Sequence, residues 1–440
     1  MPGFRGLSTL LVAALLSGAA VGQTPAPDYP ALVGQLAADD FQTRERAGVA
    51  LLQAGEAAIP DLKAALAKVA DPEAVRRLHV VLERLESNRL GEPRRVTLKV
   101  ERKPAKEVFA ELARQTGYKF RLDATIDKPL VTFDWAGTPF LQAVDQLCDV
   151  LQLNSTVEDP DGTVHIFDGD QVHPHVAYAG PFRIVATTIG SNRNAVLGGF
   201  SRRNPLQRQP DYVNLGVVVE GEPKACLCAL GQPNVVRATD ELKNSLLRGE
   251  DAALGDEVPP VAAISDLPVP AFRSHTSGAS FTLIRVARQA DYVKECHVKL
   301  SVAVLAEARP EIAVADVAKA QGQKFTGHTH LLEVGPTGVQ NNSATVAVTV
   351  RRKQPVEGDD NYSWVNTTQQ RFEAFDAEGR ALRFNGVAEQ NNEPNAVRLT
   401  LQFVRPAVGQ KPPKIAKLHL VEWVVQHKSI EFTLKDLPLP

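Results

Sequence analysis

The sequence has few of the residues that cross-link small secreted folds, and its charges of opposite sign nearly balance. Only four of its 440 residues are cysteine, too few for a disulfide scaffold, and their spacing does not match a zinc finger. The 49 basic side chains are balanced by 51 acidic ones, so the chain lacks the positive field with which nucleic-acid binders neutralise phosphates. We therefore expect a globular chain of about two to four domains that binds no nucleic acid.

Motifs of the common enzyme classes are also absent. The sequence contains no Gly-x-Ser-x-Gly turn of serine hydrolases, no Ser-x-x-Lys accompanied by Lys-Thr-Gly, and no Gly-rich phosphate loop. Two His-x-His pairs, His173 with His175 and His328 with His330, have no third ligand at a recognisable spacing. We therefore expect a protein that is not an enzyme and that has no cofactor and no metal site.

Long apolar runs are scarce, and the clearest one lies near the N-terminus. Residues 1–22 combine a basic head, an apolar stretch over 7–16 and small residues at 20–22. This pattern is typical of a secretory signal peptide, because the stretch is too short to span roughly 30 Å of hydrocarbon. We expect cleavage near Gln23, a Pro-rich spacer over 23–30, and a periplasmic or extracellular chain without a membrane span. An uncleaved anchor is the alternative.

Residues 31–90 have helical periodicity and contain two similar stretches. Each begins with an acidic cap, Asp40 or Asp71, reaches an arginine, Arg44 or Arg76, and runs into an apolar face. The offset of 31 or 32 residues resembles that of HEAT-type helical repeats, of which about one and a half units are present. An ordinary three-helix bundle is the alternative.

Residues 94–170 alternate between strand and helix patterns. The first strand covers 96–100, one amphipathic helix stops at Gly117, and a second has Thr138 as its N-cap. Asp161-Gly162 is a hairpin signal between the last two strands. The expected order is βαββαββ.

Four runs in this region carry a family resemblance: residues 96–100, 104–117, 131–133 and 137–148. They are similar to the small N-terminal module of secretins and TonB-dependent receptors, the STN domain. In that family the module lies in the periplasm and contacts protein partners, and it carries no catalytic residues. No secretin pore follows in this chain, so the resemblance does not extend to transport. The whole layout resembles that of uncharacterised exported proteins of diderm bacteria.

From residue 172 onward, period-2 alternation predicts strands to the end of the chain. A parallel α/β sheet would need crossover helices of roughly ten or more residues, and these are missing. We expect two β-sandwiches, over 172–310 and 311–440. A boundary near Lys324 and one large sandwich are the alternatives. The fold class is therefore multi-domain α+β, with a small helical repeat fragment, a βαββαββ module and a C-terminal all-β sandwich region.

The cysteines fall into two groups. Cys226 and Cys228 share one face of a predicted strand, and an exported protein meets an oxidising compartment. One disulfide from Cys296 to either of them is therefore a candidate. Cys148 lies on the apolar stripe of a predicted helix, which indicates a buried thiol.

The leading functional hypothesis is an envelope scaffold or adaptor that contacts an unidentified envelope protein; its oligomeric state stays open. The first strand of the βαββαββ module could accept a partner strand at its edge. Basic side chains around this edge would steer an acidic partner there, or alternatively keep the edge unpaired. These side chains are Arg94, Arg95, Lys99, Arg102 and Lys103.

A carbohydrate- or peptidoglycan-binding β-sandwich is the rival hypothesis. Tryptophan rings on an exposed sheet face can stack on sugars. Trp364 is the candidate platform, whereas Trp135 and Trp423 lie within apolar patterns and are expected in cores.

Overall fold

The computed structural model describes most of the chain and divides it into two compact units, Met1–Glu86 and Ser87–Pro440. With 24% helix and 52% strand, it confirms the expected multi-domain α+β class. The expected signal peptide lies outside the described residues. These are 28–123, 130–158, 161–169, 174–192, 211–247, 268, 270–285, 289–340, 342–354, 363–393, 395–405 and 413–440.

Acidic caps start the main helices of the first unit. Asp40 accepts a hydrogen bond from the Thr43 amide at 2.8 Å, and Asp71 accepts one from the Ala74 amide at 2.9 Å. Both expected caps are confirmed. Buried aliphatic side chains from the four α-helices form one core. The helices are α1 (Tyr29–Gln35), α2 (Phe41–Gln53), the 3-10 helix η1 (Glu56–Ala58), α3 (Ile59–Leu66) and α4 (Pro72–Gly91), whose last turn belongs to the second unit.

The βαββαββ module follows, and its element order confirms the expected one. β1 pairs antiparallel with β3, while β5 pairs parallel with β2 and antiparallel with β4. α5 and α6 share one apolar core with both sheets. The elements are β1 (Arg95–Pro104), α5 (Ala105–Thr116), β2 (Phe120–Leu122), β3 (Leu130–Pro139), α6 (Phe140–Leu151), β4 (Leu153–Glu158) and β5 (Thr163–Asp168).

Turn residues in this module agree with expectation at two of three positions. Gly117 ends α5 in the left-handed conformation, with φ +74°, and Gly162 makes the β4–β5 turn with φ +68°. The expected N-cap of α6 is wrong by one residue, because Pro139 occupies the cap position. Thr138 still pairs with Val96 in the β1–β3 ladder. The helix therefore begins one residue later than predicted.

The first β lobe is a two-layer sandwich. One sheet has the order β11-β8-β7-β6, and β10, β12 and β19 face it, with β9 beside β12. Side chains from both layers share one core. The strands are β6 (Val176–Ala179), β7 (Phe182–Asn192), β8 (Asp211–Gly221), β9 (Leu227–Leu230), β10 (Asn234–Asp240), β11 (Thr276–Arg285), β12 (Tyr292–Val314) and β19 (Lys417–Pro438).

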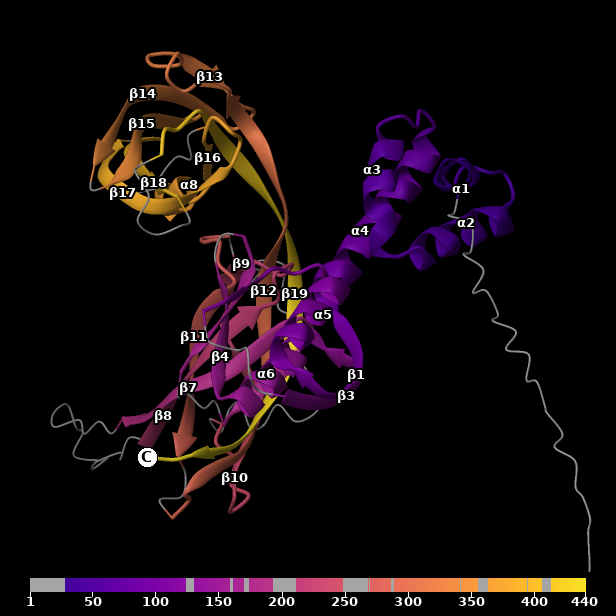
Figure 1. Cartoon of the computed structure of the whole chain (residues 1–440), viewed down its shortest axis with the longest axis vertical. Helices are drawn as coiled ribbons and strands as arrows, with labels where there is room; N and C mark the ends of the chain where they lie inside the picture. Colours follow the sequence, from indigo (N-terminus) through magenta and orange to yellow (C-terminus); the bar gives the residue numbers. More distant parts are fainter. Residues whose placement is uncertain are drawn as a thin grey trace, which may run out of the picture. The chain divides into compact units, whose positions relative to one another are not determined.

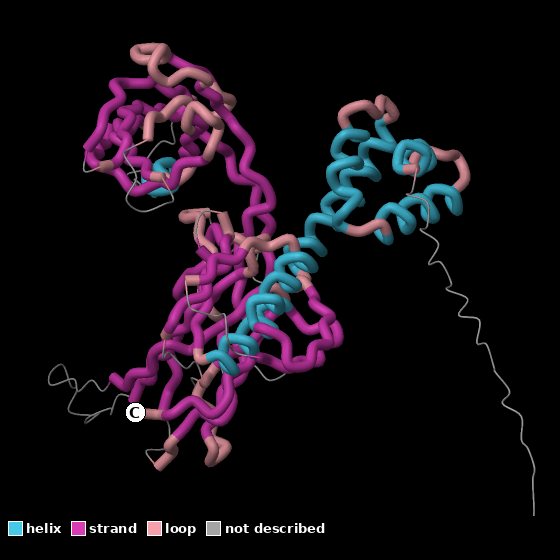
Figure 2. Tube along the Cα trace, viewed as in Figure 1, coloured by secondary structure: helices cyan, strands magenta, loops and turns pink. Residues whose placement is uncertain are grey.

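The second β lobe differs from the expected second sandwich, because one curled sheet encloses its core. The order is β12-β19-β16-β17-β18-β15-β14-β13, and Figure 1 shows these strands curving into a ring. Figure 2 shows strand as the main structure of both lobes. The remaining elements are β13 (Lys324–Thr326), β14 (His330–Gln340), β15 (Ser343–Arg352), α8 (Ser363–Gln369), β16 (Phe372–Phe375), β17 (Ala381–Glu393) and β18 (Ala396–Val404).

Two long strands are shared by the two lobes. β12 and β19 pair antiparallel from Tyr292 opposite Pro438 to Val314 opposite Leu418. The C-terminal part of β19 lies in the first core, to which it contributes four side chains. The boundary expected at residue 310 therefore needs correction, since a strand distant in sequence completes the first sandwich. The four side chains are Ile430, Phe432, Leu434 and Leu437.

Candidate functional site

The basic edge expected at β1 is present but lacks one member. Arg95, Lys99, Arg102 and Lys103 are exposed. Arg94 is half-buried, and its amide donates to both carboxylate oxygens of Glu222 at 3.1 Å. The backbone of Arg94 is therefore anchored to a buried acid, and its side chain is less exposed than those of the other four residues.

The edge of β1 is also protected against an added strand. The Oε1 atom of Gln115 accepts a hydrogen bond from the Thr97 amide at 3.0 Å, and its Nε2 donates to the Thr97 carbonyl at 2.8 Å. These backbone groups are therefore not open to a partner strand. Irregular pairing between Val100 and Lys103, where Arg102 has a φ of +47°, distorts the strand further. This geometry favours the interpretation that the edge is kept unpaired.

The candidate disulfide is wrong, because the register keeps the cysteines apart. None of the four cysteines forms a disulfide and all four are buried, which confirms the buried Cys148 thiol. The Leu305 amide on β12 donates to the Cys226 carbonyl at 2.8 Å. Cys296 lies nine residues earlier on β12 (296 against 305), or about 30 Å along an extended strand. A disulfide needs Cα atoms within about 7 Å, so neither Cys226 nor Cys228 can reach it.

Neither His-x-His pair forms a metal site where the structure describes it. No group of three or more His, Cys, Asp or Glu side chains in the described ranges is arranged to hold an ion. His173 is outside those ranges, and the exposed His328 lies 3.5 Å from Glu422. The buried His330 has its Nδ1 3.0 Å from Glu311.

Glu311 stabilises the local fold by accepting hydrogen bonds from neighbouring residues. Its Oε1 accepts the amides of Thr329 and His330, each at 2.8 Å. Burial alone would raise the pKa of Glu311, but the hydrogen bonds from His330 and Thr329 outweigh it and lower the pKa to about 2. This carboxylate fixes the turn between β13 and β14.

A buried charge network fastens the βαββαββ module to the first β lobe. Arg183 of β7 donates to Glu220 of β8 through Nε at 3.0 Å, and it also pairs with Asp145 of α6. Its Nη2 donates to the Ser155 carbonyl at 3.0 Å, and Glu220 accepts the Val157 amide at 2.6 Å. Burial acts to lower the pKa of Arg183, but the two carboxylates outweigh it and raise the pKa. The guanidinium therefore stays charged and holds α6 and β4 on the sandwich.

A second buried acid of the same lobe completes this junction. Glu222 is fully buried and accepts the Tyr118 hydroxyl at 2.9 Å as well as the Arg94 amide. Burial raises the pKa of Glu222 to about 7, although these hydrogen bonds oppose the shift. The junction therefore includes an acid that titrates near neutral pH.

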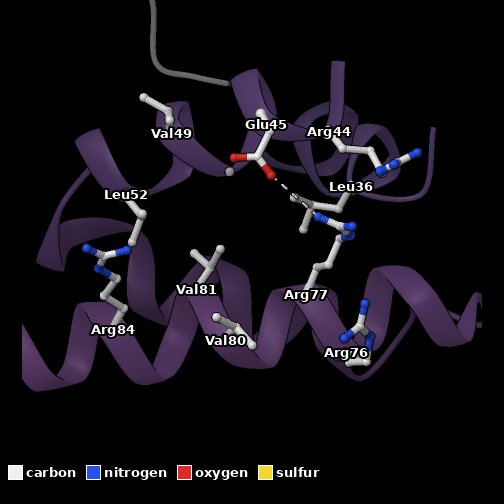
Figure 3. A pocket seen from close by; sticks show the side chains of 11 residues that line it. Leu36, Arg44, Glu45, Val49, Leu52, Arg76, Arg77, Val80, Val81 and Arg84 are labelled. Carbon is white, nitrogen blue, oxygen red and sulfur yellow. Dashed lines mark ion pairs between the residues drawn. The ribbon is translucent and has the colours of Figure 1, made fainter. Parts of the chain in front are cut away.

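The helical unit carries an open groove of about 320 Å³ between α2 and α4 (Figure 3). α4 places Arg76, Val80 and Arg84 on it at intervals of four residues. Because side chains four residues apart share a helix face, valine lies between arginines. Figure 3 shows Val49 and Val80 on either side of the groove, with 49% and 59% of their surface exposed.

α2 lines the other side of the groove with the same interval. Arg44, Gly48 and Leu52 follow one another on its face, and Leu36 and Val81 complete the apolar floor. An added Cβ at Gly48 would meet no atom within 4 Å. The glycine therefore leaves open space in the floor.

The groove is lined by more positive than negative side chains. Four arginines line it against one acid, Glu45, which lies 3.7 Å from Arg77. Arg77 and Arg76 also contact Glu73, at 2.6 and 2.9 Å. Arg84 has no hydrogen bond or ion pair with any residue that the structure describes. The groove therefore has a positive rim above an apolar floor.

Sequence reasoning found only part of this site. Arg44 and Arg76 stand out from the sequence because they recur in the two similar stretches. Arg77 and Arg84 carry no such signal. Only the packing of α2 beside α4 brings all four arginines to one groove.

The tryptophan expected as a sugar platform is covered. Trp364 packs against the core of the second lobe, and the guanidinium carbon of Arg352 lies 4.5 Å from its ring centroid. Trp135 and Trp423 are buried, as expected.

No protein-family model, curated protein or solved structure matches this chain. In the part of the chain that the structure describes, no helix combines the length and apolar character needed to cross a membrane.

Proposed function

We propose that this chain is an exported scaffold or adaptor of the cell envelope that acts through protein–protein contacts and not as an enzyme. The groove between α2 and α4 is the observation that carries the proposal. An exposed apolar patch with a polar rim marks an interaction site, and arginine is enriched in protein interfaces. The buried network around Arg183 supports the same role, because it holds the βαββαββ module in one place for contact.

The proposal includes the location and the two family resemblances. The signal-peptide pattern of residues 1–22 supports export. The order βαββαββ supports an STN-like module over 94–170, and the repeated caps Asp40 and Asp71 support a HEAT-like segment over 31–90. STN modules contact protein partners, which agrees with an adaptor.

Two other contact modes have less support. Carbohydrate or peptidoglycan binding would need an exposed aromatic face, but Arg352 covers Trp364. Strand addition at β1 would need free backbone groups, but Gln115 holds those of Thr97. The proposal still includes the exposed basic side chains around β1, such as Lys99, as a second surface for contact with a protein.

Site-specific photo-cross-linking tests the proposal. A benzophenone amino acid would replace Val80 in the groove, Lys99 on β1, or Phe41, which is exposed on α2 but does not line the groove. In envelope fractions we expect a defined protein adduct from Val80 or Lys99 and none from Phe41. The cross-linked protein, once purified, should bind this chain. Absence of protein adducts at both sites, together with retention on purified peptidoglycan, would contradict the scaffold and favour the rival.

A further inference from the structure

We infer that the groove between α2 and α4 binds an acidic amphipathic helix of a partner protein, with carboxylates on either side of an aliphatic stripe. This inference rests on the proposed function and specifies the chemistry of the partner. Four features of the groove carry the inference: the excess of positive charge on the rim, the exposed valines, the open space in the floor and the spacing of the arginines.

Charge selects an acidic partner. Four arginines and one acid, Glu45, line the groove. Glu73, which is not part of the lining, also pairs with Arg76 and Arg77, so four arginines face two acids and the rim stays positive. Arg84 has no partner among the described side chains, so its guanidinium can take a carboxylate in the two-pronged geometry that arginine favours. A basic segment would place like charges together and would be repelled.

The apolar floor selects an amphipathic helix over a simple anion. Val49 and Val80 remain half-exposed, and Gly48 leaves space that an aliphatic side chain could enter. A phosphate or sulfate ion would contact the arginines and gain nothing from the valines. An occupant therefore has to bring apolar and acidic groups together.

Spacing fits a helical occupant. Arg76 and Arg84 are eight residues apart on α4 (76 against 84), or about 12 Å at the helical rise. Val80 lies midway between them. A ligand helix with carboxylates eight residues apart and an aliphatic side chain between them repeats this pattern.

Fluorescence anisotropy with designed peptides tests the inference on the purified chain. The probe is a labelled peptide of about 20 residues, long enough to form a helix, with Glu, Leu and Glu at four-residue intervals. Two matched peptides replace every Leu on the stripe by Ser, or every Glu by Lys. We expect saturable binding of the first peptide only, weakened at high salt.

Variants of the chain identify the groove. Arg84→Glu should weaken binding about tenfold by reversing a rim charge, and Gly48→Leu should weaken it at least as much by filling the floor. Arg46→Glu and Gly34→Leu are the matched controls, because they make the same changes at helix positions that do not line the groove. Both should bind within about twofold of the wild type, and circular dichroism should show unchanged helix content in all four.

Several results would overturn the inference. These are no saturable binding of the Glu/Leu peptide, equal binding of the Ser peptide, or wild-type affinity in the Arg84 and Gly48 variants. Arginine-dependent binding to phosphatidylglycerol vesicles without peptide binding would instead indicate a lipid surface. If Val80 or Lys99 cross-links to a protein while the peptides fail, this inference falls and the scaffold proposal stands. If the Glu/Leu peptide binds but neither position yields a protein adduct, the scaffold proposal is the one in doubt.

Discussion

Glu222 shows how burial changes the chemistry of a single residue. Its carboxyl group is fully buried at the junction between the βαββαββ module and the first β lobe, and its pKa is raised from 4.5 to about 7. The folded chain therefore binds more protons than the unfolded chain between these two values. The associated stability is fully present below pH 4.5 and is lost as pH rises through about 7.

Substituting Glu222 by Gln tests this linkage. The variant cannot titrate, so its free energy of unfolding should fall less than that of the wild type between pH 5 and 8, by about 1–3 kcal/mol. Urea unfolding at four pH values measures the difference. The exposed Glu107, changed to Gln, is the control and should leave the wild-type slope in place. Parallel pH profiles for wild type and Glu222→Gln would contradict the assignment.

The buried cysteines lead to a second prediction at the residue scale. Burial raises the pKa of Cys148, Cys228 and Cys296 to about 12, so their thiolates are scarce near neutral pH. We expect alkylation to be slow in the native chain, and four thiols to react in guanidinium without reductant. Mass spectrometry counts the labels. Two labels instead of four would indicate a disulfide that the β9–β12 register does not allow.

At the scale of single elements, helix glycines differ in their roles. Gly117 ends α5 at φ +74°, a conformation that alanine adopts at a cost, whereas Gly48 lies inside α2 with open space at its Cβ. Gly117→Ala should therefore destabilise the chain by about 1 kcal/mol, while Gly48→Ala should stabilise it by about 0.5–1 kcal/mol. Thermal melts followed by circular dichroism separate the two signs. Equal shifts in the same direction would show that conformation is not the cause.

Local signals predicted the helices and turns well. The caps at Asp40 and Asp71 and the turn at Gly162 depend on neighbouring residues, so the sequence is sufficient to find them. The N-cap of α6 failed because the β1–β3 ladder extends through Thr138, and a partner strand lies outside any local pattern. The groove could not be predicted for the same reason, since Arg84 becomes a site residue only when α4 packs beside α2.

At the scale of the whole second unit, β19 joins regions that are far apart in sequence. Removing residues 430–440 would take Ile430, Phe432, Leu434 and Leu437 from the first core. Each buried side chain contributes about 1.5–3 kcal/mol, and together they approach the stability of a typical domain. We expect faster hydrogen exchange in β8 and β12, measured by mass spectrometry, and continued protection in β15.

The control for this truncation is Glu431→Ala, an exposed side chain on the same strand. It should leave exchange in β8 nearly unchanged. If the truncated chain protects β8 as well as the full chain does, then β19 does not complete the sandwich.

Domain boundaries were the least predictable feature at this scale. Period-2 alternation identifies strands such as β8 and β12, but it carries no information about which strands pair. Strand register also determines that Cys226 and Cys296 cannot form a disulfide, because the pairing of β9 with β12 holds the two residues apart. Long-range pairing therefore accounts for the two clearest errors in the sequence analysis.

The position of β19 also constrains the order in which the chain folds during synthesis. Its partner β12 emerges from the ribosome more than a hundred residues earlier (314 against 417). Until residue 437 has emerged, one layer of the sandwich lacks its neighbour, while the βαββαββ module already has all its strands. From the end of β12 until residue 437 has emerged (437 − 314 = 123 residues), the nascent chain therefore keeps an exposed apolar strand, the state that chaperones recognise.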